Sequence, residues 1–252
     1  MICYHGLPMS GPQLAAAKIL AGRDAMVSFY EPSQMEIAAE VCRSVVIDCG
    51  AFSAWKAGQP ITDWSDYYAF CRYWQKHPAV HWCIVPDIID GTEEQNDELL
   101  KEWPHYGRGV PVWHLHESLD RLWRLGYEWG RVALGSSGEY ATIGTPKWWQ
   151  RMAEAMTVLC DKKGRPKIPF HGLRMLDPTL LAHFPFQSAD STNVARNIGL
   201  DVRWGGPYAP KSLHVRAAVI MDRIESHAKC SRWIGTQGQQ LNFELLDCAG
   251  GA

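Results

Sequence analysis

The sequence predicts an α/β protein, a single (β/α)8 TIM barrel that spans residues 1–252. Eight short apolar runs without polar alternation recur along the chain, as expected of parallel strands that are buried on both faces. Amphipathic segments with recognisable helix starts separate these runs, and eightfold strand–helix alternation favours a closed barrel over an open doubly wound sheet. A length of 252 residues suits one such barrel, and no linker, low-complexity tract or repeat divides the chain.

The predicted strands are Ile2–His5, Met26–Tyr30, Val45–Asp48, Trp82–Asp87, Val110–His114, Arg131–Gly135, Ile168–Gly172 and Phe186–Asp190. The predicted helices are Gln13–Gly22, Gln34–Arg43, Trp64–Lys76, Glu93–Trp103, Ser118–Trp129, Pro146–Asp161, a short Pro178–His183, and Ser212–Lys229. The helix starts follow known signals: Ser33-x-x-Glu36 and Thr92-x-x-Gln95 are capping-box patterns, and Thr145-Pro146 places proline in a first turn.

The composition indicates a protein that buries a large core and stays in water. Hydrophobic residues make up 46% of the chain, and the mean hydropathy is −0.22. No apolar run approaches the ~20 residues of a membrane span, and the N-terminal residues do not resemble a signal peptide. The eight cysteines lie far apart without a Cys-x-x-Cys pair, which argues against a zinc knuckle or a redox pair. We expect a cytoplasmic protein with no membrane partner, no metal and no cofactor.

Charge is distributed unevenly along the chain. The net charge is −2, yet residues 160–232 contain 12 Lys and Arg against 6 Asp and Glu. A basic C-terminal half suits a polyanion that contacts one face, although an uneven solvated surface has the same composition.

Polar side chains close most of the predicted strands, where a barrel of this kind carries its chemistry. These strand-end residues are His5, Tyr30, Asp48, Asp87, His114, His116, Gly135, Ser136, His171 and Asp190. The carboxylates Asp48 and Asp190 are the main candidates, because a pair that flanks a glycosidic carbon is what retaining glycosyl transfer requires. Helix capping or structural ion pairing is the alternative for each of them.

Four segments, in this order, resemble the tRNA-guanine transglycosylase superfamily. Asp48-Cys-Gly-Ala-Phe52 resembles that family's Asp-Ser-Gly-Gly-Phe/Tyr segment, and Val85-Pro-Asp87 resembles its base-reading segment. The run from Ala133 to Glu139 is similar to its Gly-Gly-Leu-Ala-Val-Gly-Glu loop. Asp190, followed six residues later by Arg196, resembles the nucleophile and a phosphate-binding arginine. Together the segments cover residues 45–200.

The sequence departs from the family pattern at several places, and these departures indicate which branch of the family it resembles most. The Cys-x-Cys-x-x-Cys…His zinc site of the tRNA enzymes has no counterpart, so we expect a barrel that lacks their zinc subdomain. His114 replaces a glutamine of the family, and His171 stands where a Met-Gly-Val-Gly segment is expected. The chain therefore looks most like the compact phage-type transglycosylases that insert a 7-deazaguanine base such as preQ0 into DNA, in which case the host cytoplasm is the expected location. A tRNA-guanine transglycosylase is the alternative.

The resemblance implies a role for each candidate residue. Asp190 would attack C1′ to form a covalent glycosyl–enzyme intermediate, and Asp48 would act as general acid and base. The base would contact Phe52, Asp87 or its competitor Asp90, His114, His116, Gly135, Ser136 and His171. The backbone of a single-stranded or flipped DNA target would contact Arg174, Arg196, Asn197 and Arg203. A homodimer is an open alternative to the monomer.

Two other classes of function are compatible with the sequence. His114-x-His116 at one strand end, with His171 and Asp190 at later ones, imitates a metal-dependent barrel hydrolase. In such an enzyme Asp190 would be a metal ligand or the base for a metal-bound water. A non-catalytic DNA-binding barrel is the third hypothesis, but binding alone does not require both Asp48 and Asp190.

Overall fold

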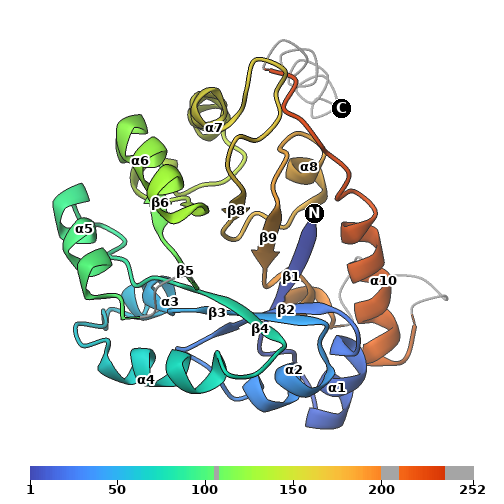
Figure 1. Cartoon of the computed structure of the whole chain (residues 1–252). Helices are drawn as coiled ribbons and strands as arrows, with labels where there is room; N and C mark the ends of the chain where they lie inside the picture. Colours follow the sequence, from blue (N-terminus) through green and yellow to red (C-terminus); the bar gives the residue numbers. More distant parts are fainter. Residues whose placement is uncertain (105–107, 200–209, 236–252) are drawn as a thin grey trace.

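A computed structural model describes residues 1–104, 108–199 and 210–235, and its strands form a parallel barrel (Figure 1). Each of the eight predicted strands is present within a few residues of its expected bounds. The strands are β1 Ile2–Gly6, β2 Asp24–Ser28, β3 Ser44–Asp48, β4 Val80–Ile84, β5 Gly109–Val110, β6 Val112–His114, β7 Val132–Gly135, β8 Phe170–Gly172 and β9 Ser188–Ser191. The predicted α/β barrel is confirmed.

The sheet order β5-β4-β3-β2-β1-β9-β8-β7-β6 describes an almost closed ring. The first and last strands pair directly, with Tyr4 opposite Asp190. The ends of the order, β5 and β6, are two halves of the predicted fifth strand on either side of Pro111. Proline has no N–H for the ladder, but the Pro111 carbonyl accepts a hydrogen bond from Ala133 N–H at 2.9 Å. The fifth strand thus joins β4 to β7, with one interruption.

Helices cover the outside of the barrel (Figure 1). Those that the sequence predicts are α1 Gln13–Leu20, α2 Met35–Val41, α4 Ser65–Trp74, α5 Glu93–Glu102, α6 Leu119–Trp129, α7 Pro146–Leu159, α8 Pro178–Leu181 and α10 Leu213–Glu225. Thr92 and Gln95 form the predicted capping box of α5. The capping box predicted at Ser33 is wrong, because α2 begins after Gln34 without a side-chain cap. Among the described residues, no helix is long and apolar enough to cross a bilayer.

Three short helical turns were not predicted, and each follows a strand at the same end of the barrel. They are α3 Ala51–Lys56 after β3, the 3-10 turn η1 Gly138–Tyr140 after β7, and α9 Asn193–Asn197 after β9. Segments this short carry little helical periodicity. Two of them, α3 and α9, contribute residues to the lining of the cavity described below.

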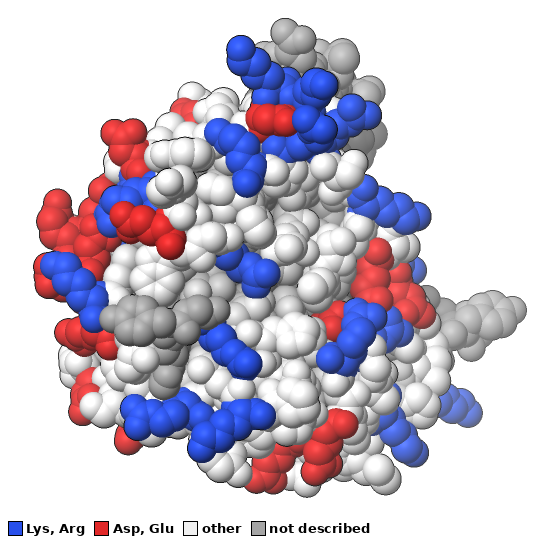
Figure 2. All heavy atoms as spheres, in the orientation of Figure 1, with Lys and Arg blue, Asp and Glu red and all other residues white. Residues whose placement is uncertain are grey.

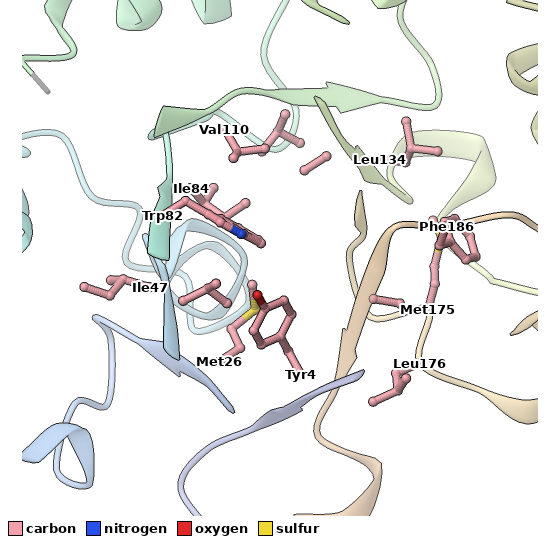
Figure 3. Packing of buried hydrophobic residues seen from close by; sticks show 14 of the residues in the cluster. Tyr4, Met26, Ile47, Trp82, Ile84, Val110, Leu134, Met175, Leu176 and Phe186 are labelled. Atoms are coloured by element: carbon pink, nitrogen blue, oxygen red, sulfur yellow. The ribbon is translucent and has the colours of Figure 1, made fainter. Parts of the chain in front are cut away.

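Side chains alternate between the barrel interior and the helix layer. Tyr4, Met26 and Trp82 meet inside the ring of strands (Figure 3), and the Tyr4 and Trp82 rings pack edge to face at 5.7 Å. The next residue, His5, points outward, where its Nε2 lies 2.9 Å from Glu225 Oε1 on α10. The expectation that His5 contributes to the barrel mouth is therefore wrong. Successive residues of β1 point to opposite faces, so His5 points to the helix layer while Tyr4 points into the barrel.

Candidate active site

A cavity of about 640 Å³ opens at the carboxyl ends of the strands. Ten of the predicted site residues line it, namely Asp48, Phe52, Asp87, His114, Gly135, Ser136, Arg174, Asp190, Arg196 and Asn197. Asp90, His116 and His171 do not line it, and Arg203 lies outside the described residues. The topology thus brings together residues from strands that are distant in sequence.

Asp190 lies on β9 and is 7% exposed. Its Oδ1 accepts hydrogen bonds from the Arg174 backbone N–H at 2.9 Å and from His171 Nε2 at 3.1 Å. Among the described residues its Oδ2 accepts no hydrogen bond. One carboxylate oxygen is therefore anchored, while the side chain as a whole lines the cavity.

Asp48 ends β3 and shares the cavity with Asp190. Burial is the main cause that raises its pKa to about 7, and the negative charge of Asp190 raises it further. Hydrogen bonds to Asp48 Oδ2 from Ser28 Oγ at 3.0 Å and from Gly50 N–H at 3.1 Å oppose the shift. A carboxyl group with this pKa can release and accept a proton near neutral pH.

Gly50 makes the turn from β3 into α3. Its φ is +83°, and a Cβ at this position would lie 2.8 Å from the backbone nitrogen of Tyr30. Only glycine adopts such a backbone easily and fits so close to a neighbour. The turn aims the Gly50 N–H at Asp48 and places Phe52 on the cavity wall.

Asp87 and His114 form a polar pair on the wall of the cavity, with 9% and 2% exposure. His114 Nε2 lies 2.9 Å from Asp87 Oδ2, close enough for an ion pair when the imidazole is protonated. Neither ring nitrogen of His114 has an aligned hydrogen bond among the described residues. Cys49 Sγ donates to Asp87 Oδ1 at 3.4 Å. Each carboxylate oxygen of Asp87 thus has a neighbouring side chain, which fixes the orientation of the carboxylate on the cavity wall.

Arg174 crosses the cavity from the loop after β8. Its guanidinium lies 3.8 Å from the centre of the Phe52 ring and donates to the Ser136 carbonyl at 2.7 Å. The Ser136 hydroxyl in turn accepts a hydrogen bond from Trp148 Nε1 at 2.9 Å. Arg174 has a φ of +60°, which is uncommon for a residue other than glycine. The guanidinium thus lies against one face of Phe52, the residue that was expected to contact the base.

His116 and Asp90 lie at the rim, outside the cavity lining. His116 is exposed, stacks on His114 with ring centres 5.6 Å apart, and bonds Ser137 Oγ at 2.8 Å. Asp90 accepts a hydrogen bond from Trp55 Nε1 at 2.6 Å on the surface. Of the two competing aspartates, Asp87 is therefore the one that faces the cavity.

Basic groups at the cavity come from both short helices. Arg196 on α9 and Lys56 on α3 are exposed and line the cavity. Asn197 Nδ2 is bonded back to the Asn193 carbonyl at 2.9 Å. Sequence reasoning missed Lys56, since its position depends on the unpredicted α3. It also missed Ser28, although Ser28 ends β2 and the strand-end argument could have found it.

The largest group of basic side chains in view lies away from the cavity. Lys and Arg gather at the top of Figure 2 over the loop between α7 and β8, while Asp and Glu gather at the left over α5 and α6. That loop enters β8 from its amino end, opposite to the cavity. The charge imbalance in the sequence therefore does not by itself identify the functional face.

The metal-dependent hydrolase would need a cluster of ligands. In the part of the chain that the structure describes, no group of three or more His, Cys, Asp or Glu has a metal-binding arrangement. His171, one of the expected ligands, directs its ring nitrogens at Ser188 Oγ and Asp190 Oδ1. No observation of the described residues favours that alternative.

The sequence matches no protein-family model and no curated protein. Among solved structures it is similar to two mutant forms of the tryptophan synthase alpha-subunit from the hyperthermophile Pyrococcus furiosus. Each is 12% identical over 88% of this chain and 97% of the other, with TM-scores of 0.47 and 0.45. Likeness of this degree carries no argument about the reaction, so the function must be argued from the cavity itself.

Proposed function

We propose that this protein is a nucleic-acid guanine transglycosylase that exchanges guanine in DNA for a 7-deazaguanine base such as preQ0. One observation carries the proposal: Asp48 and Asp190 share one cavity, and the charge of Asp190 helps to raise the pKa of Asp48 to about 7. Two carboxyl groups in one site, one as nucleophile and one as general acid and base, are the pair that retaining glycosyl transfer uses. The sequence resemblance adds the substrate class.

In the first step, a lone pair on Asp190 forms a bond to C1′ of the target nucleoside while the bond from C1′ to the base nitrogen N9 breaks. The electron pair leaves with guanine, which takes the proton of Asp48. In the second step, Asp48 removes the N9 proton of the incoming base, whose nitrogen attacks C1′ and releases the Asp190 carboxylate. Each step inverts C1′, so the overall configuration is retained.

Recognition of the base is assigned to Asp87 and His114. Guanine and its 7-deaza analogues share the N1–H and 2-amino edge, which a carboxylate can accept as two hydrogen bonds. Asp87 lines the cavity, and His114, whose Nε2 lies 2.9 Å from Asp87 Oδ2, would orient this carboxylate toward the base. A volume of about 640 Å³ lies within the range of roughly 300–1,000 Å³ that is common for small-molecule sites.

The assignment to DNA depends on the resemblance to the compact enzymes without a zinc subdomain. The base edge of a duplex is inaccessible, so the target must be flipped out or single-stranded. Arg196 and Lys56 are exposed and line the cavity, and in this proposal they would contact the phosphates on either side of the target. A tRNA substrate would use the same chemistry and the same cations.

The test is incorporation of radiolabelled guanine into guanine-containing DNA or tRNA, with the wild type beside Asp190→Asn. We expect label in DNA with the wild type and none with Asp190→Asn, which should fold and bind DNA as the wild type does. Label in tRNA alone would keep the chemistry and change the polymer. Absence of label in both polymers, or full activity of Asp190→Asn, contradicts the proposed function.

A further inference from the structure

We infer that His171 is a positioning residue that fixes Asp190 so that its Oδ2 is the attacking oxygen. The inference rests on the proposed function. Both hydrogen bonds that Asp190 accepts fall on Oδ1, from His171 Nε2 and from the Arg174 backbone N–H. Rotation of the carboxylate would break both, so the two bonds hold it in one orientation and leave Oδ2 without a hydrogen bond among the described residues.

Ser188 completes the arrangement. His171 Nδ1 lies 2.9 Å from Ser188 Oγ, and this bond is fully buried. A hydroxyl that donates to Nδ1 leaves the imidazole proton on Nε2, where it can be donated to Asp190. Ser188 and Asp190 are two residues apart on β9 and so share one face, and His171 on β8 is in register with Ser188. The register of β8 against β9 therefore places the three side chains side by side, and they form the hydrogen-bonded chain Ser188–His171–Asp190.

His171 has no access to a substrate. It is 0% exposed, does not line the cavity, and packs edge to face against Trp82 with ring centres 5.1 Å apart. The role that the sequence suggested, direct contact with the base, is replaced by a role through Asp190. Dense packing around the ring restricts its rotation and so adds rigidity to the carboxylate.

The same contact acts again in the second step. In the covalent intermediate Oδ2 is bonded to C1′ and Oδ1 is the ester carbonyl oxygen. When the C1′–Oδ2 bond breaks, negative charge returns to the carboxylate, and the two donors on Oδ1 stabilise it. Loss of His171 should therefore slow the breakdown of the covalent intermediate as well as its formation.

The molecule offers a matched control in His5. It is also 0% exposed, and its Nε2 also contacts a carboxylate oxygen, that of Glu225 at 2.9 Å against 3.1 Å for Asp190, but on the outer face of the barrel. We expect His171→Leu to lower kcat for guanine exchange about 10–100-fold, the usual effect of losing such a supporting contact, with KM for DNA unchanged. His171→Gln, which can still donate a side-chain N–H, should recover part of the rate. His5→Leu should lower thermal stability without lowering kcat.

Unchanged kcat in His171→Leu beside an active wild type would refute the positioning role and leave the proposed function intact. An inactive wild type refutes the proposed function, and the role of His171 falls with it. If His171→Leu does not fold, Ser188→Ala takes its place, with a smaller expected loss of kcat. Nitrogen-15 NMR of the wild-type imidazole gives a readout without turnover: a proton on Nε2 supports the inference, and a neutral ring protonated only on Nδ1 overturns it.

Discussion

Asp48→Asn should abolish base exchange and at the same time make the folded protein more stable at alkaline pH. The pKa of Asp48 is raised from 3.8 to about 7, mainly by burial. The native state therefore binds the proton more tightly than the unfolded state, and ionisation above pH 4 costs stability until the native carboxyl also ionises near pH 7. Asparagine is neutral at every pH and can still accept the bonds from Ser28 and Gly50.

The magnitude follows from the shift. At 1.36 kcal/mol per pH unit, a displacement from 3.8 to about 7 corresponds to at most about 4 kcal/mol. Solvent in the open cavity screens part of this, so we expect about 2–4 kcal/mol at pH 8. Between pH 5 and pH 8 the advantage of Asp48→Asn over the wild type should grow by about 1.5–3 kcal/mol.

Urea denaturation of both proteins at pH 5, 6.5 and 8 measures this difference directly. Asp63→Asn is the control, because the side chain of Asp63 is exposed and its pKa is lowered rather than raised. Its stability relative to the wild type should not rise between pH 5 and pH 8. A stability difference for Asp48→Asn that is the same at all three pH values would refute the raised pKa of Asp48.

Exchange catalysed by the wild type should lose kcat/KM as pH rises through about 7, because the general acid Asp48 is then deprotonated; a flat pH–rate profile from pH 6 to 8.5 contradicts this. Asp87→Ala should accept guanine and adenine analogues with reduced discrimination in a competition assay, and unchanged preference would move base reading elsewhere. Gly50→Ala should cost about 1–3 kcal/mol in urea denaturation, since φ is +83° and such strain has this size. Arg196→Ala should reduce the salt dependence of DNA binding by about one phosphate contact, whereas Arg165→Ala, on the loop opposite the cavity, should leave it unchanged.

The fold could be predicted because its signals are local. Apolar runs mark buried parallel strands, and Thr92 with Gln95 or Thr145 with Pro146 mark helix starts within four residues of sequence. Strand-end positions also predicted where Asp48, Asp87 and Asp190 would meet. Pro111 shows the limit of such reasoning, because the interruption of the fifth strand depends on a missing donor and not on hydrophobic pattern.

The roles of the histidines could not be read in the same way. His5 and His114 end predicted strands and His171 is next to the end of one, yet His5 contacts a helix, His114 lines the cavity and His171 is buried in contact with Asp190. Successive residues of a strand point to opposite faces, so an error of one residue in the position of a strand reverses the predicted direction of every side chain. Strand bounds predicted from sequence are less accurate than one residue. Contacts across strands then decide which atom of each ring is engaged.

A barrel with carboxylates at the carboxyl ends of its strands could be inferred from the sequence, because local apolar pattern marks the buried strands and their alternation with helices favours a barrel. The pKa of Asp48 near 7 and the hydrogen bonds that anchor Oδ1 of Asp190 follow only from the folded arrangement. The first property depends on burial and on the charge of Asp190, 142 residues away in the chain, and the second on hydrogen bonds from His171 and Arg174, 19 and 16 residues away. Electrostatic interactions and hydrogen bonds act over a few ångströms in space, so they are fixed only when the ring of strands has closed.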